Sequence, residues 1–164
     1  MSSFGGHSEV GKLRRVIVHR PGPEMRRLTP SNAAELLFDD VPWATRAREE
    51  HDAFVAIMRD DFGIDVMLVH ELLEDVVATP EGRAYVLDRK LIADEVGVNG
   101  VDAMRSWMDE LEPAMLVRHL IGGVTVGELP AGFRSCATKA YGDHQFVLPP
   151  LPNQLFTRDS SSWI

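Results

Sequence analysis

The sequence predicts an α/β protein that begins with a strand–helix–strand unit and continues into a segment made only of helices. Two runs rich in β-branched residues, 13–19 and 64–69, flank a long amphipathic stretch. A crossover of this length returns the chain in the same direction, so we expect the two strands to pair in parallel. From residue 70 to about 122 the apolar positions recur at steps of three or four, which is the helical period.

The first strand is predicted over residues 13–19, where Val16, Ile17 and Val18 form an apolar centre and a Pro-Gly-Pro turn follows at 21–23. Ser31 or Asn32 is suited to cap a short helix over residues 33–38. The segment between the two strands therefore contains a turn and a short helix before its main helix begins.

Pro42 suits the first turn of that main helix, which we expect to run to about Asp61 and to end at Gly63. The charged run at residues 46–52 is its solvated face. The side chains expected near one apolar face are Ala47, Phe54, Val55 and Met58.

The helical segment is broken at Pro80, Gly97, Gly100 and Pro113, so it contains several helices. Their apolar periodicity predicts a core rather than a cofactor site. This core is expected to include Leu73, Val76, Val77, Tyr85, Leu87, Leu91, Ile92, Met104, Trp107, Met108 and Leu111. Residues 124–142 are expected to form a loop and one more helix, and residues 146–151 form an apolar run broken by prolines.

Composition excludes several classes of function. The chain of 164 residues carries 17 Lys and Arg against 25 Asp and Glu, a formal net charge of -8, so neither nucleic acid nor an anionic membrane is an expected partner. Cys136 is the only cysteine, which excludes an intrachain disulfide, and no two of the six histidines have the spacing of metal ligands. No signal peptide or long apolar run is present, and we expect a cytoplasmic protein without a metal or organic cofactor.

Asp159 is the strongest candidate for a functional side chain, because it lies between a loop rich in proline and polar residues and an apolar strand start. A carboxylate there could hold a cation, and a guanidinium would offer two parallel charge-assisted hydrogen bonds. The alternative is a local ion pair between Arg158 and Asp159 with no ligand.

The segment PNQLFTRDSSSWI at residues 152–164 resembles the signature of the arginine deiminases. Further blocks resemble the same family in the same order: HSEVGKLRRVIVHRPG at 7–22, LTPSNAAELLFDDVPW at 28–43, LDRK at 87–90, LIGG at 120–123 and FVLPPLPN at 146–153. The resemblance therefore extends over nearly the whole chain.

The resemblance implies a role for four residues. Asp159 would bind the guanidinium nitrogens of L-arginine, Phe156 would line the substrate channel, and Asn153 would contact the amino-acid end of the substrate. Leu37 matches a position whose main-chain carbonyl meets the substrate's α-amino group. Asp39 and Asp40 follow it, and they would either belong to the site or cap the next helix.

The resemblance also implies the pentein fold, an α/β propeller of five modules with a helical domain inserted after the first. Residues 1–69 would be the first module, residues 70–145 the all-helical insertion, and residues 146–164 the first strand of the next module. This chain would then be a partial propeller with one βαβ-type module.

The implied reaction is hydrolysis of arginine to citrulline and ammonia, in which a cysteine thiolate attacks the guanidinium carbon. The nucleophile, His, its neighbouring Asp and Glu of the family lie beyond position 164, and Cys136 lies in a segment without a matching role. We therefore expect a truncated chain, inactive alone, whose partners are L-arginine and either further copies or the remaining part of the enzyme. The alternatives are a stand-alone non-catalytic module for arginine binding or assembly, and another guanidine-modifying enzyme of the same fold.

Overall fold

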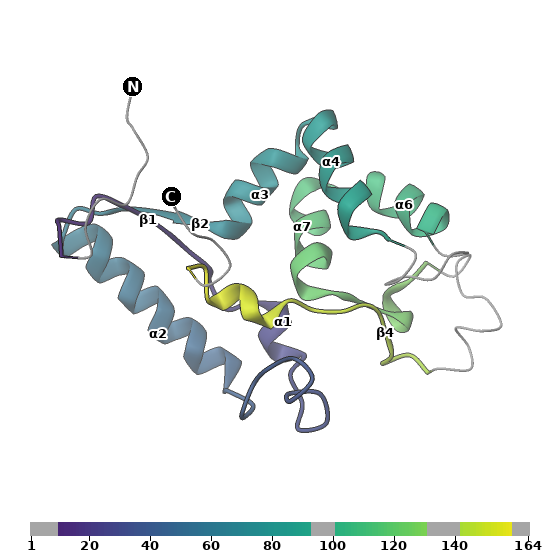
Figure 1. Cartoon of the computed structure of the whole chain (residues 1–164), viewed down its shortest axis with the longest axis horizontal. Helices are drawn as coiled ribbons and strands as arrows, with labels where there is room; N and C mark the ends of the chain where they lie inside the picture. Colours follow the sequence, from purple (N-terminus) through teal and green to yellow (C-terminus); the bar gives the residue numbers. More distant parts are fainter. Residues whose placement is uncertain (1–9, 93–100, 131–141, 159–164) are drawn as a thin grey trace.

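The computed structural model describes residues 10–92, 101–130 and 142–158 (Figure 1). A short sheet and one long helix occupy one end of the molecule, and a group of helices occupies the other. The first part contains β1 (Arg15–Val18), α1 (Pro23–Arg26), α2 (Ala44–Ala56), the π-helical turn η1 (Ile57–Asp61) and β2 (Asp65–Leu68). The remainder contains α3 (Val69–Val77), α4 (Pro80–Lys90), α6 (Val101–Asp109), α7 (Pro113–Gly122), β3 (Val124–Thr125), η2 (Val126–Glu128), β4 (Phe146–Leu148) and η4 (Pro152–Leu155).

The two predicted strands pair in parallel, as the length of the crossover between them required. Arg15 lies opposite Asp65 and Val18 opposite Leu68 in the register. Each strand is four residues long, a little shorter than the apolar run that predicted it. The strand–helix–strand prediction is therefore confirmed, and the protein is of the mixed α/β class.

The long helix α2 begins at Ala44 and continues through η1, close to the predicted end at Asp61. Gly63 follows with φ of 63°, the left-handed conformation that ends many helices. Val55 and Met58 pack with Val66 of β2 in a small core, as expected. Phe54 is expected on the same face, but its side chain is 54% exposed. It is the residue before Val55, and successive residues of a helix point about 100° apart, so Phe54 points away from the core.

The predicted short helix over residues 33–38 is wrong. Residues 30–37 form consecutive turns instead. Asn32 explains the difference, because its side chain donates to the Arg27 carbonyl (2.9 Å) and accepts from the Thr29 amide (2.7 Å). Those bonds hold the chain in a local turn that competes with a helix.

The helical segment is confirmed over the described residues between 69 and 122. Thr79 caps α4 by accepting from the Gly82 amide (3.1 Å), and Pro80 and Pro113 occupy the first turns of α4 and α7. Gly97 and Gly100 lie outside the described residues. The side chains at the centre of the core are Val77, Leu87, Leu91, Met104, Met108, Leu116, Val117, Leu120, Ile121 and Val124.

The predicted Met and Trp stripe is part of this core, since Met104 and Met108 are 3% and 0% exposed and Trp107 packs against them. The outer edge of the prediction is wrong. Val76 and Tyr85 are 44% and 58% exposed, because they lie on the solvent side of α3 and α4. No helix in the described part of the chain is long and apolar enough to cross a membrane.

The expected loop and helix over residues 124–142 are replaced, in the described part, by β3 and the 3-10 turn η2; residues 131–141 are outside it. β3 pairs antiparallel with β4, with Val124 opposite Leu148. Gly123 makes this possible, since its φ is +78° and a Cβ there would lie 2.6 Å from the Leu148 carbonyl oxygen. Sequence periodicity does not report such a close approach between distant segments.

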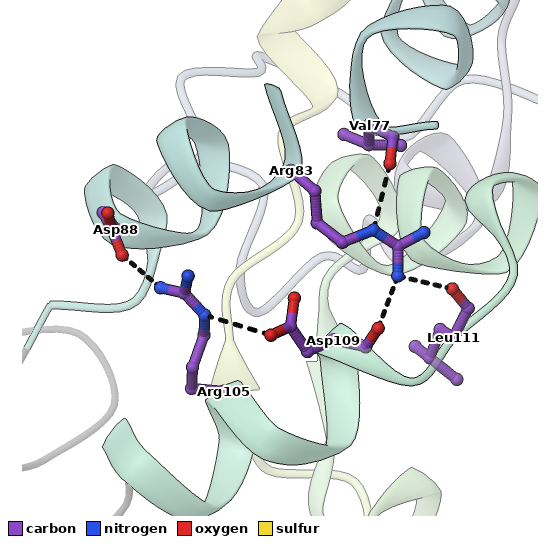
Figure 2. Close-up of polar contacts among 6 residues, drawn as sticks. All are labelled: Val77, Arg83, Asp88, Arg105, Asp109 and Leu111. Atoms are coloured by element: carbon purple, nitrogen blue, oxygen red, sulfur yellow. Dashed lines mark hydrogen bonds and ion pairs between the residues drawn. The ribbon is translucent and has the colours of Figure 1, made fainter. Parts of the chain in front are cut away.

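Arg83 of α4 joins the carboxyl-terminal ends of two other helices, α3 and α6 (Figure 2). Its Nε donates to the Val77 carbonyl at the end of α3 (3.0 Å). Its Nη1 donates to the carbonyls of Asp109 (2.6 Å) and Leu111 (2.8 Å), after α6. One planar guanidinium therefore satisfies acceptors that two helices leave unpaired at their ends.

Arg105 adds an ion pair on the same side of these helices (Figure 2). It pairs with Asp88 of α4 and lies 3.9 Å from Asp109 of its own helix. Since Asp88 and Asp109 are about half exposed or more, this pair contributes less than the Arg83 bonds.

We expect Arg83→Ala to lower the free energy of unfolding by about 2–3 kcal/mol, because three carbonyl acceptors lose a charged donor. Urea unfolding followed by tryptophan fluorescence and far-UV circular dichroism measures this change. Arg89→Ala is the matched control on the same helix; it removes an exposed contact with the Tyr85 ring and is expected to cost less than about 1 kcal/mol. Equal losses in the two variants would contradict the role given to Arg83.

The buried residue His119 is expected to make the stability of the protein depend on pH. Burial lowers the pKa of His119 from the ordinary 6.5, and its ring packs against Trp107 with centroids 5.2 Å apart and planes tilted by 54°. Below pH 6.5 the unfolded chain binds a proton that the folded one resists, so stability falls as pH drops from there toward the lowered folded pKa.

The variant His119→Phe keeps the ring contact and cannot titrate, so its thermal stability should change less than that of the wild type between about pH 7.5 and 5.5. Calorimetry across that range is the measurement. His144→Gln, at an exposed histidine, controls for loss of an imidazole and is expected to follow the wild type. Parallel curves for His119→Phe and the wild type would refute the assignment.

Candidate functional site

Three of the four residues predicted for the site are described by the structure, namely Leu37, Asn153 and Phe156. Asp159, the predicted guanidinium ligand, lies outside the described residues, as does Cys136. The geometry around the first three is built from a turn near the start of the chain and from η4 near its end.

η4 is held in place from the helical part of the molecule. The chain leaves β4 through Pro149 and Pro150, and the Leu151 amide donates to the Ile121 carbonyl of α7 (2.9 Å). Pro152 then begins the 3-10 turn and is fully buried. Asn153 and Phe156 are therefore presented at the two ends of a short, anchored turn.

The turn that carries Leu37 ends in the hydrogen-bond pattern usual at the end of a helix. The Phe38 amide donates to the Ala33 carbonyl (2.8 Å) and the Leu37 amide to the Ala34 carbonyl (3.2 Å). This pattern places Leu37 where glycine is usual, and its φ is 63°. A leucine in the left-handed region costs roughly 1 kcal/mol, so surrounding contacts must hold it there.

The side chain of Leu37 is 81% exposed. Phe38 is half-buried. The left-handed conformation at Leu37 reverses the chain and turns its side chain away from the interior. The functional group that this residue can offer is accordingly in its main chain.

Two contacts join the turn to η4 across more than a hundred residues of sequence. Asn153 Nδ2 donates to the Leu36 carbonyl (2.9 Å). The rings of Phe38 and Phe156 lie with centroids 6.2 Å apart and planes tilted by 34°, within the range of favourable aromatic pairs. The structure thus brings Leu37, Asn153 and Phe156 into one place.

Thr157 connects the same place to the sheet, because its hydroxyl donates to the Ile17 carbonyl of β1 (3.1 Å). The chain that leads toward Asp159 therefore passes beside β1. Phe156 is 50% exposed, which leaves half of its side chain available to a ligand or to another segment.

Asp39 and Asp40 do not cap the next helix. Both are exposed, and Asp40 Oδ1 accepts from the Val41 amide (2.7 Å). The residue before α2 is Trp43, which makes no side-chain capping bond. The capping alternative for these two carboxylates is therefore wrong.

A hollow of about 360 Å³ lies beside α2 and the end of β2. Arg20 pairs with both carboxylate oxygens of Asp52 (2.6 and 2.5 Å), and this hydrogen bonding lowers the pKa of Asp52. Burial lowers the pKa of His51. The charges of Arg20 and Asp52 therefore offset each other in this hollow. Its lining is Arg20, His51, Asp52, Val55, Ala56, Arg59, Asp60 and Leu68.

A second hollow, of about 470 Å³, lies beside Arg27. Arg27 Nη2 donates to Glu128 Oε1 (2.5 Å). Burial raises the pKa of Glu128, but hydrogen bonds from Thr125 and the charge of Arg27 outweigh it, so the net pKa is lowered. The residues that line this second hollow are Arg27, Thr29, Ser31, Asn32, Thr125, His144 and Phe146. Across the described residues, no three His, Cys, Asp or Glu side chains are grouped as metal ligands would be.

The sequence did not point to two groups that join the segments of the candidate site, the Phe38 ring and the Leu36 carbonyl. The only available signal was the LLFDD run at residues 36–40, in which the resemblance singled out Leu37 alone. A backbone acceptor and a ring contact between distant segments have no sequence pattern of their own.

Three known arginine deiminases are similar to the chain. It is 41% identical to that of Mycobacterium marinum over 167 residues, covering 100% of this chain and 41% of the relative. It is 42% identical to the arginine deiminase of Rhodococcus erythropolis, in a match that covers 98% of this chain and 40% of the relative. It is 43% identical to the arginine deiminase of Mycobacterium avium, in a match that covers 98% of this chain and 41% of the relative. The chain thus spans about two-fifths of the length of these relatives.

The family model of arginine deiminase matches residues 34–164, a range that includes both the Leu36–Phe38 turn and η4. The match covers well over half of the 164 residues. The chain therefore belongs to the arginine deiminase family.

Proposed function

We propose that the protein containing this chain is an arginine deiminase, which hydrolyses L-arginine to L-citrulline and ammonia, and that this chain supplies part of its substrate site. The observation that carries the proposal is the junction of Leu36–Phe38 with Asn153 and Phe156. Residues that the family resemblance assigns to the substrate come together there from opposite ends of the chain.

The chemistry of each group suits arginine. A main-chain carbonyl at Leu37 accepts a hydrogen bond from the substrate's α-ammonium group, and the Asn153 amide meets the amino-acid end. The exposed half of the Phe156 ring packs along the substrate's methylenes. Asp159 receives the guanidinium through two parallel hydrogen bonds, which orient its planar carbon for attack.

The covalent step requires groups that the family places after the residues matched here. A cysteine thiolate adds to the guanidinium carbon, ammonia leaves after protonation, and an amidino thioether remains. Water activated by a histidine then adds to the same carbon, citrulline leaves and the thiolate is restored. Asp159 stabilises the positive charge throughout.

We also propose that residues 1–69 are the first module of a pentein propeller, residues 70–145 its inserted helical domain, and residues 146–164 the entry to the next module. The βαβ unit and helices α3 to α7 support this division. The insertion is not all-helical as predicted, because it includes the short strand β3, which pairs with β4 of the following segment. The exposed Phe54, Ile57 and Phe62 on the α2 side support it too, because a neighbouring module would cover such side chains.

The complete protein encoded by the reading frame of this chain is expected to release citrulline and ammonia in equal amounts from L-arginine. Asp159→Asn keeps the shape of the side chain but removes its charge, so kcat/KM should fall by at least about a hundredfold. Steady-state assays with colorimetric detection of citrulline measure kcat/KM for the wild type and for this variant.

Asp102→Asn, at an exposed carboxylate in the first turn of α6, is the control and should keep wild-type kinetics within about twofold. Turnover of agmatine or methylated arginine in preference to arginine would move the assignment to another guanidine-modifying enzyme. A complete protein that binds arginine without turnover would indicate a non-catalytic module.

A further inference from the structure

Leu37 combines two properties that rarely coincide in a residue without a function. Its backbone lies in the left-handed region with φ of 63°, and its side chain is 81% exposed. A large apolar side chain gains little from such exposure, and the conformation is unfavourable for leucine. What the conformation does accomplish is to orient the peptide group that follows.

The residues on both sides of Leu37 are fastened to the same short turn. Leu36, before it, accepts a hydrogen bond from Asn153 Nδ2 through its carbonyl (2.9 Å). Phe38, after it, packs its ring against Phe156 (6.2 Å between centroids). An unfavourable φ persists only where neighbouring contacts hold it, and these two contacts act on either side of the residue.

The bond to Leu36 also determines how the Asn153 amide is oriented. Only the amide nitrogen can donate to a carbonyl, so Nδ2 faces Leu36 and Oδ1 is directed elsewhere. The Leu37 carbonyl accepts no hydrogen bond from the described residues. The Leu37 carbonyl and Asn153 Oδ1 are thus two oxygen acceptors on segments joined by the Asn153–Leu36 bond, and acceptors of this kind suit an ammonium group.

We propose that Phe38 is a positioning residue: through its ring contact with Phe156, and together with the Asn153–Leu36 bond, it holds Leu37 in the left-handed conformation that presents its carbonyl to the substrate's α-ammonium group. This inference rests on the proposed function. It adds that discrimination at the amino-acid end depends on an aromatic pair that does not itself touch the reacting carbon.

The test compares arginine with 5-guanidinopentanoate, which is arginine without its α-amino group. Phe38→Leu in the complete protein is expected to raise KM for arginine about tenfold and to change kcat by less than about twofold. The inhibition constant of 5-guanidinopentanoate should rise no more than about twofold, since that molecule lacks the group that the Leu37 carbonyl binds. Phe38→Tyr keeps the ring and should restore wild-type values for both.

Tyr85→Leu, at an exposed aromatic residue of α4, is the matched control and should alter neither constant. An equal rise in KM for arginine and in the inhibition constant of 5-guanidinopentanoate would overturn the inference, because Phe38 would then act on the channel or the fold in general. A wild-type protein without deiminase activity would instead defeat the proposed function.

A second pair of variants keeps the inference falsifiable if Phe38→Leu does not fold. Leu37→Gly accepts a positive φ without strain and is the reference variant of this pair. Leu37→Val strongly disfavours that φ and should have a KM for arginine about tenfold above that of Leu37→Gly, without a matching difference for 5-guanidinopentanoate. Indistinguishable kinetics in these two variants would show that the backbone conformation of Leu37 does not matter.

Discussion

The parallel pairing of β1 with β2 is the constraint from which the rest of the arrangement follows. Because parallel strands have their carboxyl ends at the same edge, the chain leaves the sheet twice from neighbouring points. After Val18 it enters α1 and the turn that carries Leu37, and after Leu68 it passes directly into α3 and the helical part. A two-stranded sheet is weak alone, and Val55 and Met58 cover it by packing with Val66 of β2 and with Val16 and Val18 of β1.

The two parts meet again where α1 lies against α7. His19 and Glu24 are buried there as a pair, with Nε2 3.1 Å from Oε1, and the Gly22 amide also donates to that oxygen (2.5 Å). Gly122 allows the approach, since a Cβ at its position would lie 3.0 Å from Pro23 Cβ. This junction stabilises α7, and the Ile121 carbonyl of α7 in turn receives the Leu151 amide that anchors η4. The site is thus supported from the sheet and from the helices together.

In the described part of this acidic chain, arginines make most of the long-range side-chain hydrogen bonds. Arg83 closes the ends of α3 and α6, Arg27 reaches Glu128 across 101 residues, and Arg20 holds Asp52. A guanidinium carries five N–H donors spread over a planar fork, so it can bond acceptors on separate segments at once. The net charge of -8 therefore coexists with positive charges placed at the joints of the fold.

The sequence by itself determined the class of the fold, the parallel pairing, the helical middle and its Met-rich core, because these depend on periodicity and crossover length that are written locally. The family resemblance also predicted Leu37, Asn153, Phe156 and Asp159 as one site, and the first three lie in segments that the structure brings together. Only the tertiary structure decided that residues 30–37 form turns, that β3 pairs with β4 after Gly123, and that Phe38 and the Leu36 carbonyl join η4. Each of these depends on a contact between segments far apart in the chain, and the energy of such a contact cannot be read from either segment alone.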